Sequence, residues 1–466
     1  MKSVEGAAAL VLAAGKGTRM KSSRAKVLHN LLEEPLLRFP LKSLADSGIG
    51  NVAVVVGHGS DEVESYLGST WPEVSVIHQT DQKGTGHAVQ VAGSWWEAHP
   101  TLLILPGDAP LLPPEAIASL LTTHLSSRSA ATFLTFEAEN PTGYGRVVRK
   151  PGGCRIVEEK DASLEEKKIS EVNSGIYAFE TACLSKVISL LDNRNAQGEL
   201  YLPDVLRLLG ETGDHVEALL WPNPEDLSGI NDPLQLAAAN RAMRNRIVKA
   251  HLLAGVKMLD PETTWIGPEV ILEPDVFLEP NVQIWGNSVV ETGTTVGSHT
   301  ILRNVHLGKE SHVLAFCHVT NSVIGPGAKV GPFACLRDNT RLAAMALAGD
   351  FVEIKNSNIG EGSKVPHLSY MGDATIGKQS NIGAGTITCN YDGVRKNPTK
   401  IGDRCFVGSD TMLVAPVTLQ DDSFTAAGST ITEDVPPGAL AVGRARQRNI
   451  EGWARRKNAA NRKEED

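Results

Sequence analysis

The first half of the chain alternates short apolar runs with stretches of helical periodicity. Apolar runs of strand length, bounded by Gly, Pro or Asp, occupy Ala8–Ala13, Val52–Val56 and Leu102–Leu105. Between them, Leu36–Ala45 and Ala88–Trp96 carry apolar residues at helical spacing. This alternation predicts an α/β fold with a mostly parallel sheet.

The pattern changes near residue 232. Leu234–Leu253 contains no Gly or Pro, and Gly255 follows its end. These features predict one long amphipathic helix that connects two domains. We expect a first domain over 1–232, a linker helix over 233–254, a second domain over 255–450 and a charged, frayed tail over 451–466.

Aliphatic residues recur every six positions through the second domain. The series includes Ile266, Leu272, Leu278, Ile284, Val290, Val296, Leu302, Ile324, Val330, Leu336, Leu342, Ile401, Val407, Leu413 and Leu419. A six-residue period is typical of hexapeptide repeats, in which each hexad forms one side of a parallel β-helix coil, whereas ordinary antiparallel strands have a period of two. The register breaks near Arg341–Phe351 and at Cys389–Lys400, where we expect functional loops.

Composition narrows the class of protein. The chain has 466 residues, 41% of them hydrophobic and 21% charged, with a net charge of −9, which argues against a nucleic-acid partner. Six scattered cysteines without a C-x-x-C pair indicate reduced thiols and a cytoplasmic location. The apolar run Ala7–Ala14 is shorter than the roughly 20 residues of a membrane span, so no membrane partner is expected.

A glycine-rich turn follows the first predicted strand. Leu12–Met20 reads LAAGKGTRM, and Lys26 comes seven residues after Arg19. Glycines at a strand end let backbone N–H groups approach a phosphate, and the two cations add charge. The string matches neither the dinucleotide-binding G-x-G-x-x-G pattern nor a Walker A loop, and a Gly-rich turn alone is weak evidence.

Further polar strings follow in the same half. Asp108 ends the third apolar run, where a carboxylate can hold Mg²⁺ at the carboxyl edge of a sheet. The other strings are Gln79 with Gly84-Thr85, Pro141–Arg146, Val157–Ala162, Asn173–Gly175 and Gly229-Ile230-Asn231. Each has a simpler interpretation by itself, such as a turn cap or a solvated charge.

In this order, the strings resemble the sugar-nucleotide pyrophosphorylases, and more narrowly the N-acetylglucosamine-1-phosphate uridylyltransferases. The resemblance implies a Rossmann-like nucleotidyltransferase domain, Mg²⁺ held by Asp108 and Asn231, and catalytic cations at Arg19 and Lys26 that offset charge on the departing pyrophosphate. The UDP-N-acetylglucosamine-binding residues that it implies are Leu12, Ala13, Ala14, Gly15, Lys26, Gln79, Gly84, Thr85, Gly145, Glu158, Asn173 and Asn231. Pro106 and Ala25 depart from the usual pattern of these enzymes.

The β-helix carries a second set of motifs. Val365–Asp373 reads VPHLSYMGD, a string similar to one in the glucosamine-1-phosphate acetyltransferase domain. His367 is the candidate general base, because the substrate amine must lose a proton before it attacks the thioester. The similarity implies substrate binding by Arg337, Lys355, Tyr370, Asn381, Asn390 and Tyr391, and acetyl-coenzyme A binding by Ala384, Ser409, Ala427 and Arg444. Pro366 and Cys335 are departures from the family pattern.

Together the two halves, over about residues 7 to 453, resemble the GlmU family of bifunctional enzymes. The resemblance implies acetylation of glucosamine 1-phosphate by acetyl-coenzyme A, then transfer of UMP from UTP to N-acetylglucosamine 1-phosphate, supplying precursors of peptidoglycan and lipopolysaccharide. It also implies a left-handed β-helix and a homotrimer with sites between subunits. One alternative is a single-activity pyrophosphorylase with a structural or regulatory β-helix, which would not need His367 or Arg444. Another is a non-enzymatic solenoid that serves as an interaction surface, against which Arg19 and Asp108 count.

Overall fold

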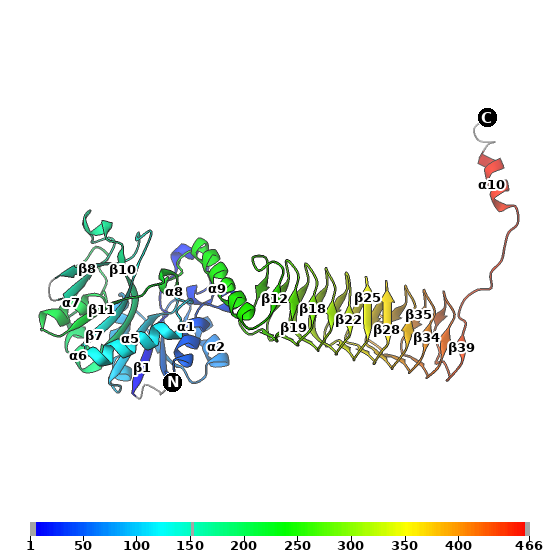
Figure 1. Cartoon of the computed structure of the whole chain (residues 1–466), viewed down its shortest axis with the longest axis horizontal. Helices are drawn as coiled ribbons and strands as arrows, with labels where there is room; N and C mark the ends of the chain where they lie inside the picture. The colour runs from blue at the N-terminus through cyan, green and yellow to red at the C-terminus, as the bar shows by residue number, and fades with distance from the viewer. Residues whose placement is uncertain (1–5, 151–152, 462–466) are drawn as a thin grey trace. The chain divides into compact units, whose positions relative to one another are not determined.

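The computed structural model describes residues 6–150 and 153–461. The chain divides into two compact units, Met1–Arg244 and Asn245–Asp466. Figure 1 shows an α/β arrangement in the first unit and stacked coils in the second.

The first unit is built on a mostly parallel sheet. Its strands, in the order β11-β7-β10-β6-β1-β4-β5, are β11 (Val216–Leu220), β7 (Ala131–Glu137), β10 (Glu171–Glu180), β6 (Thr101–Pro106), β1 (Ala7–Leu12), β4 (Asn51–Val56) and β5 (Ser75–His78). β10 runs antiparallel to β6 and β7, and the hairpin of β8 (Arg146–Lys150) and β9 (Gly153–Val157) attaches to it. The three strands predicted from the apolar runs are confirmed as β1, β4 and β6.

Helices cover both faces of this sheet because side chains alternate along each strand. Val11 faces a core with α1 (Arg38–Asp46), α2 (Ser60–Thr70) and α5 (Pro114–Ser127). Leu10 faces a core with α3 (Thr85–Val91), α4 (Gly93–Trp96), α6 (Thr181–Val187) and α7 (Asp204–Glu211). The helix predicted over Ala88–Trp96 is two short helices, since the chain leaves helical geometry at Ala92, before the poor helix former Gly93.

The structure has a helix, α9 (Pro233–Leu253), over the segment predicted to be helical. The division between the two units falls within this helix. Ala239 and Ala242 pack in a first-unit cluster with Leu31 and Leu36, whereas Val248 belongs to the core of the second unit.

The second unit is a left-handed parallel β-helix, running from β12 (Lys257–Met258) to β39 (Leu440–Ala441). An 11-stranded sheet forms one side, and a 17-stranded sheet with two parallel ladders forms the rest. The aliphatic positions of the repeat fill the interior, with Ile284, Leu302 and Ile382 all 0% exposed. The hexapeptide prediction is therefore confirmed.

The prediction of a functional loop near Arg341–Phe351 is wrong. Residues near Arg341–Phe351 form an ordinary coil, in which β25 (Leu347–Asp350) pairs with β22 (Lys329–Val330) and β28 (Lys364–His367). Ala348 fills the interior position and is fully buried. The six-residue repeat therefore continues here with a small residue in place of a large aliphatic one. The second interruption is a true insertion, between β32 (Ile387–Cys389) and β33 (Thr399–Ile401).

The C-terminal tail contains a helix, α10 (Trp453–Asn461). Ala, Arg and Lys are good helix formers, which accounts for the helix. Its residues are exposed through Asn458.

Candidate active sites

A cavity of 630 Å³ lies in the first unit, at the carboxyl ends of the parallel strands β1 and β6. Ligands of open α/β sheets bind at this edge. The sequence-predicted residues that line it are Leu12, Ala14, Gly15, Arg19, Lys26, Gln79, Gly84, Thr85, Asp108, Glu158, Asn173 and Asn231. Ala13 is buried next to the lining, and Gly145 packs against the Glu158 side chain.

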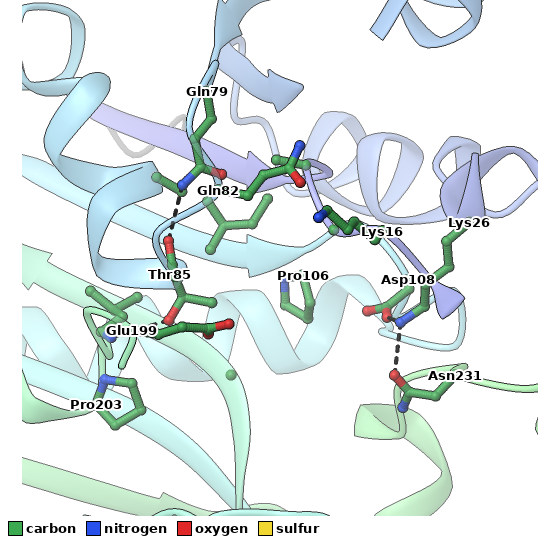
Figure 2. A pocket seen from close by; sticks show the side chains of 18 of the residues that line it. Lys16, Lys26, Gln79, Gln82, Thr85, Pro106, Asp108, Glu199, Pro203 and Asn231 are labelled. Atoms are coloured by element: carbon green, nitrogen blue, oxygen red, sulfur yellow. Dashed lines mark hydrogen bonds and ion pairs between the residues drawn. The ribbon is translucent and has the colours of Figure 1, made fainter. Parts of the chain in front are cut away.

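Two cationic side chains and two side chains with acceptor oxygens lie together at one end of this cavity. The Lys26 ammonium forms an ion pair with the Asp108 carboxylate, and Nζ also donates to Asn231 Oδ1 at 2.8 Å. Arg19 Nη2 donates to the same Asn231 oxygen at 2.8 Å. Figure 2 shows Lys26, Asp108 and Asn231 together. The four residues come from three distant parts of the sequence.

Local backbone features hold this cluster. Gly17 adopts φ +57, and a Cβ there would lie 2.7 Å from Lys26 Cβ, so glycine lets Lys26 pack against the turn. Ile230 N–H donates to the Asp108 carbonyl at 2.9 Å, which places Asn231 beside Asp108. Gly107 N–H donates to the Leu12 carbonyl at 2.9 Å and ties the end of β6 to β1.

Asp108 and Asn231 are suited to a hard divalent cation. Both are oxygen donors, and both contact the same Lys26 Nζ atom, so they converge on one position. Within the described residues, no cluster of three or more His, Cys, Asp or Glu side chains could hold a metal. Mg²⁺ commonly binds through one or two protein ligands together with substrate phosphates, and this donor set fits it.

The other end of the cavity is formed by loops that hydrogen bonds hold together. Gln79 is 4% exposed, and its Nε2 donates to the Gly84 carbonyl at 3.0 Å. Leu202 N–H donates to Thr85 Oγ1 at 3.1 Å, so the loop that carries Glu199 is held against the start of α3. Figure 2 shows Gln79, Thr85 and Glu199 at this end, apart from the cation cluster.

The side chains of Glu158 and Asn173 also line the cavity. Burial raises the pKa of Glu158 to about 7, with a further contribution from the Asp204 and Asp161 carboxylates. Asn173 Nδ2 donates to the Tyr177 hydroxyl at 2.6 Å. Burial raises the pKa of Tyr177, so its hydroxyl stays neutral. Glu158, Asn173 and Tyr177 therefore offer neutral and weakly acidic groups, in contrast to the charged cluster of Arg19, Lys26 and Asp108.

On the β-helix, the predicted residues His367, Ala384, Ser409 and Ala427 align in one column, together with Asp350, which the sequence did not indicate. Hydrogen bonds between successive coils link Leu368 N–H to the Asp350 carbonyl, Gly385 N–H to His367, Asp410 N–H to Ala384 and Gly428 N–H to Ser409. Each of these N–H donors comes directly after a column residue in the sequence. The column therefore runs, coil by coil, through Asp350, His367, Ala384, Ser409 and Ala427. Arg444 lies at its end, because a Cβ on Gly428 would be 3.9 Å from Arg444 Cδ.

The His367 imidazole has a carboxylate partner. His367 Nδ1 lies 2.5 Å from Asp350 Oδ1, and both side chains are exposed, at 56% and 40%. This hydrogen bond lowers the pKa of Asp350.

The residues predicted to bind the sugar phosphate lie on the 17-stranded sheet. Arg337 of β23 (Cys335–Arg337) pairs in register with Lys355 of β26 (Glu353–Lys355). Tyr370 and Asn390 both lie over Gly372, where a Cβ would be 2.4 Å from the Tyr370 hydroxyl and 2.7 Å from Asn390 Nδ2. These four positions thus form a group of basic and hydrogen-bonding side chains.

Two other predicted residues lie apart from this group. Asn381 belongs to β31 (Asn381–Ile382) of the 11-stranded sheet. Tyr391 is 62% exposed, and its hydroxyl donates to the Gly393 carbonyl at 2.7 Å within the inserted loop.

Comparisons with known proteins agree with both units. The MobA-like NTP transferase domain matches residues 9–198, and the hexapeptide repeat of succinyl-transferase matches residues 398–433. A protein of Corynebacterium aurimucosum named bifunctional protein GlmU is 46% identical over 464 residues, covering 98% of this chain and 95% of its own. Those of Streptomyces coelicolor and Carboxydothermus hydrogenoformans are 44% and 45% identical, covering 98% and 96% of this chain and 96% and 99% of their own.

The chain belongs to the GlmU family. It is therefore a bifunctional transferase of UDP-N-acetylglucosamine synthesis, with a nucleotidyltransferase domain and a hexapeptide acetyltransferase repeat. The GlmU relatives match across both units, which favours this interpretation over a single-activity pyrophosphorylase. Among the described helices, none has the length and apolar character that crossing a membrane requires.

Sequence reasoning missed several residues of the GlmU-type cavity. Gln82, Glu199, Leu202 and Pro203 line it, as does Tyr177. Tyr177 lies two residues after the Asn173–Gly175 string, so strand alternation could have placed it on the same face. The segment 199–203 carries no comparable signal, because its position depends on contacts with residues 83–86 that are distant in sequence.

Proposed function

We propose that the two reactions of this enzyme occur at separate sites, uridylyl transfer in the first-unit cavity and acetyl transfer along the Asp350–Ala427 column of the β-helix. The first domain spans about residues 1–232 and the acetyltransferase about 255–450, joined by the helix over 233–254. The observation that carries this proposal is the column itself, because it aligns His367 with Ala384, Ser409 and Ala427.

For uridylyl transfer, the charges of the cavity suggest how the chain assists the reaction. The sugar phosphate attacks the α-phosphorus of UTP and pyrophosphate departs, so positioning and charge neutralisation are the protein's tasks. Arg19 and Lys26 offset charge on the departing pyrophosphate, and Gln79 with Thr85 lines the end that accepts the uracil and sugar. Asp108 and Asn231 would hold Mg²⁺, which supplies Lewis-acid charge to the phosphates when bound.

For acetyl transfer, His367 accepts the proton of the substrate amine as the amine attacks the thioester carbonyl; the C–N bond forms, the C–S bond breaks and coenzyme A leaves as the thiolate. Ala384, Ser409 and Ala427 would line the acetyl-coenzyme A groove, with Arg444 at its end. Arg337, Lys355 and Tyr370 are suited to bind the phosphate of glucosamine 1-phosphate, through charge-assisted hydrogen bonds.

We further propose a homotrimer in the cytoplasm. Asn381 lies on the 11-stranded sheet, whereas Arg337, Lys355 and Tyr370 lie on the other, so neighbouring copies would be needed to bring both groups to one substrate. All six cysteines are unpaired, which fits a reducing compartment. Light scattering should give the mass of a trimer, and a monomer with full acetyltransferase activity would contradict shared sites.

The test is His367→Ala, assayed for each reaction separately. Acetylation of glucosamine 1-phosphate should fall by about 10² to 10⁴, the usual contribution of a positioned general base. Uridylylation of supplied N-acetylglucosamine 1-phosphate should be unchanged, because it uses the other unit. Normal acetylation with reduced uridylylation would show that the two sites are wrongly assigned.

A further inference from the structure

His367 contacts Asp350, a residue that lies outside the sequence motif containing His367. Asp350 Oδ1 lies 2.5 Å from His367 Nδ1, and the two residues are paired in register on adjacent strands, β25 and β28. An ionised carboxylate can only accept hydrogen bonds. Because the pKa of Asp350 is lowered, the proton of this bond belongs to Nδ1.

The backbone fixes this contact. Gly349 precedes Asp350, and a Cβ there would lie 1.9 Å from the Pro366 carbonyl oxygen, so the absence of a side chain allows the two coils to approach closely. Leu368 N–H donates to the Asp350 carbonyl at 3.0 Å, directly after His367. The pairing of Asp350 with His367 therefore follows from the stacking of the coils.

Among the residues that the structure describes, no other titratable side chain occupies the neighbouring positions of this column. In register, the coil before Asp350 contributes Pro332 and the coil after His367 contributes Ala384. Glu353, three residues after Asp350, is ion-paired to Arg337 at 2.6 Å. Lys364 begins the His367 strand and is exposed, and Asp410 lies farther along, against Gly385.

We infer that Asp350 is a positioning residue for acetyl transfer: it holds His367 as the Nδ1–H tautomer and leaves the Nε2 lone pair to take the proton of the substrate amine. When that proton arrives, the imidazolium lies beside a carboxylate, which stabilises the charge that develops. No bond to Asp350 forms or breaks. This inference rests on the proposed role of His367 as general base.

The test is the pH dependence of kcat/KM for acetyl transfer in Asp350→Asn. Loss of the negative charge favours the neutral imidazole, so the midpoint of the acidic limb should move to lower pH by about 1 unit. The maximal rate should fall by about 10-fold or more, less than the loss in His367→Ala. A role confined to folding would lower the rate at every pH and leave the midpoint in place, and that result would overturn the inference.

Two further variants separate the possible outcomes. Asp275→Asn removes an exposed carboxylate, paired with Lys257 at 2.8 Å in the first coils, and should leave the profile unchanged. In the double variant, Asp350→Asn should add nothing to the loss from His367→Ala, because the two residues act as one unit. If His367→Ala acetylates normally, the proposed base is wrong. If that variant is inactive while Asp350→Asn keeps the wild-type midpoint and rate, only the role of Asp350 is refuted.

Discussion

Individual residues of the nucleotide cavity have chemical properties that their neighbours impose. Glu158 shows this best, since burial and nearby carboxylates raise its pKa to about 7. In the unfolded chain its pKa is the ordinary 4.5. The folded state thus binds the proton more tightly, and Glu158 contributes stability below about pH 4.5 that is lost as the pH rises through about 7.

Glu158→Gln, which is neutral at every pH, should remove this dependence. At pH 8 the variant should exceed the wild type in free energy of unfolding by on the order of 1 kcal/mol, and the difference should shrink at pH 5. Denaturant titrations of the full chain at both pH values measure it. Glu165→Gln, at an exposed residue paired with Lys168, is the control and should show no such trend. Equal differences at both pH values would contradict the raised pKa.

The sequence indicated which residues gather in the cavity better than it indicated how they interact. Arg19, Lys26, Asp108 and Asn231 were all predicted from motifs, and the structure brings them together. Their mutual contacts could not be predicted, because three separate segments must fold before the side chains meet. Asp350 was missed for the same reason, since its contact with His367 depends on the register between coils.

At the scale of elements, the repeat predicted the solenoid because its period is a property of the sequence alone. It failed near Arg341–Phe351, where Ala348 occupies an interior position that larger aliphatic residues fill elsewhere. A loss of pattern can therefore mean a small core residue as well as an insertion. The Cys389–Lys400 insertion was predicted from the same loss of pattern, and there the structure has a true insertion between β32 and β33.

The close approach of two coils at Gly349 gives a prediction for this element. Gly349→Ala places a Cβ 1.9 Å from the Pro366 carbonyl oxygen, so the coils must separate. We expect a loss of about 1–3 kcal/mol of stability and a marked fall in acetyl transfer, because Asp350 and His367 move apart. Uridylyl transfer should be unaffected.

The matched control for this variant is Gly267→Ala in the same solenoid. A Cβ at Gly267 would have its nearest neighbour, Trp285 Cε3, at an ordinary 3.5 Å. Thermal unfolding and both assays should therefore match the wild type. If Gly349→Ala also behaved as the wild type, the close packing of the two coils would be unimportant for the site.

At the scale of the whole molecule, the chain contains two folds that bring their site residues together in different ways. The first unit gathers charge at the edge of a mostly parallel sheet, and the second arranges side chains in columns by stacking similar coils. The GlmU relatives match across both units, so the pairing of the two activities is a property of the entire chain.

The most direct test of this account is to identify the products of Asp108→Ala supplied with glucosamine 1-phosphate, acetyl-coenzyme A, UTP and Mg²⁺. The variant lacks the carboxylate that meets Lys26, so UDP-N-acetylglucosamine formation should fall by 10²-fold or more, on the order expected for loss of a charged group that stabilises a transition state. N-acetylglucosamine 1-phosphate should accumulate at the wild-type rate, because the β-helix acetylates independently. UDP-N-acetylglucosamine at the wild-type rate, or failure of both reactions in a correctly folded protein, would contradict two separate sites.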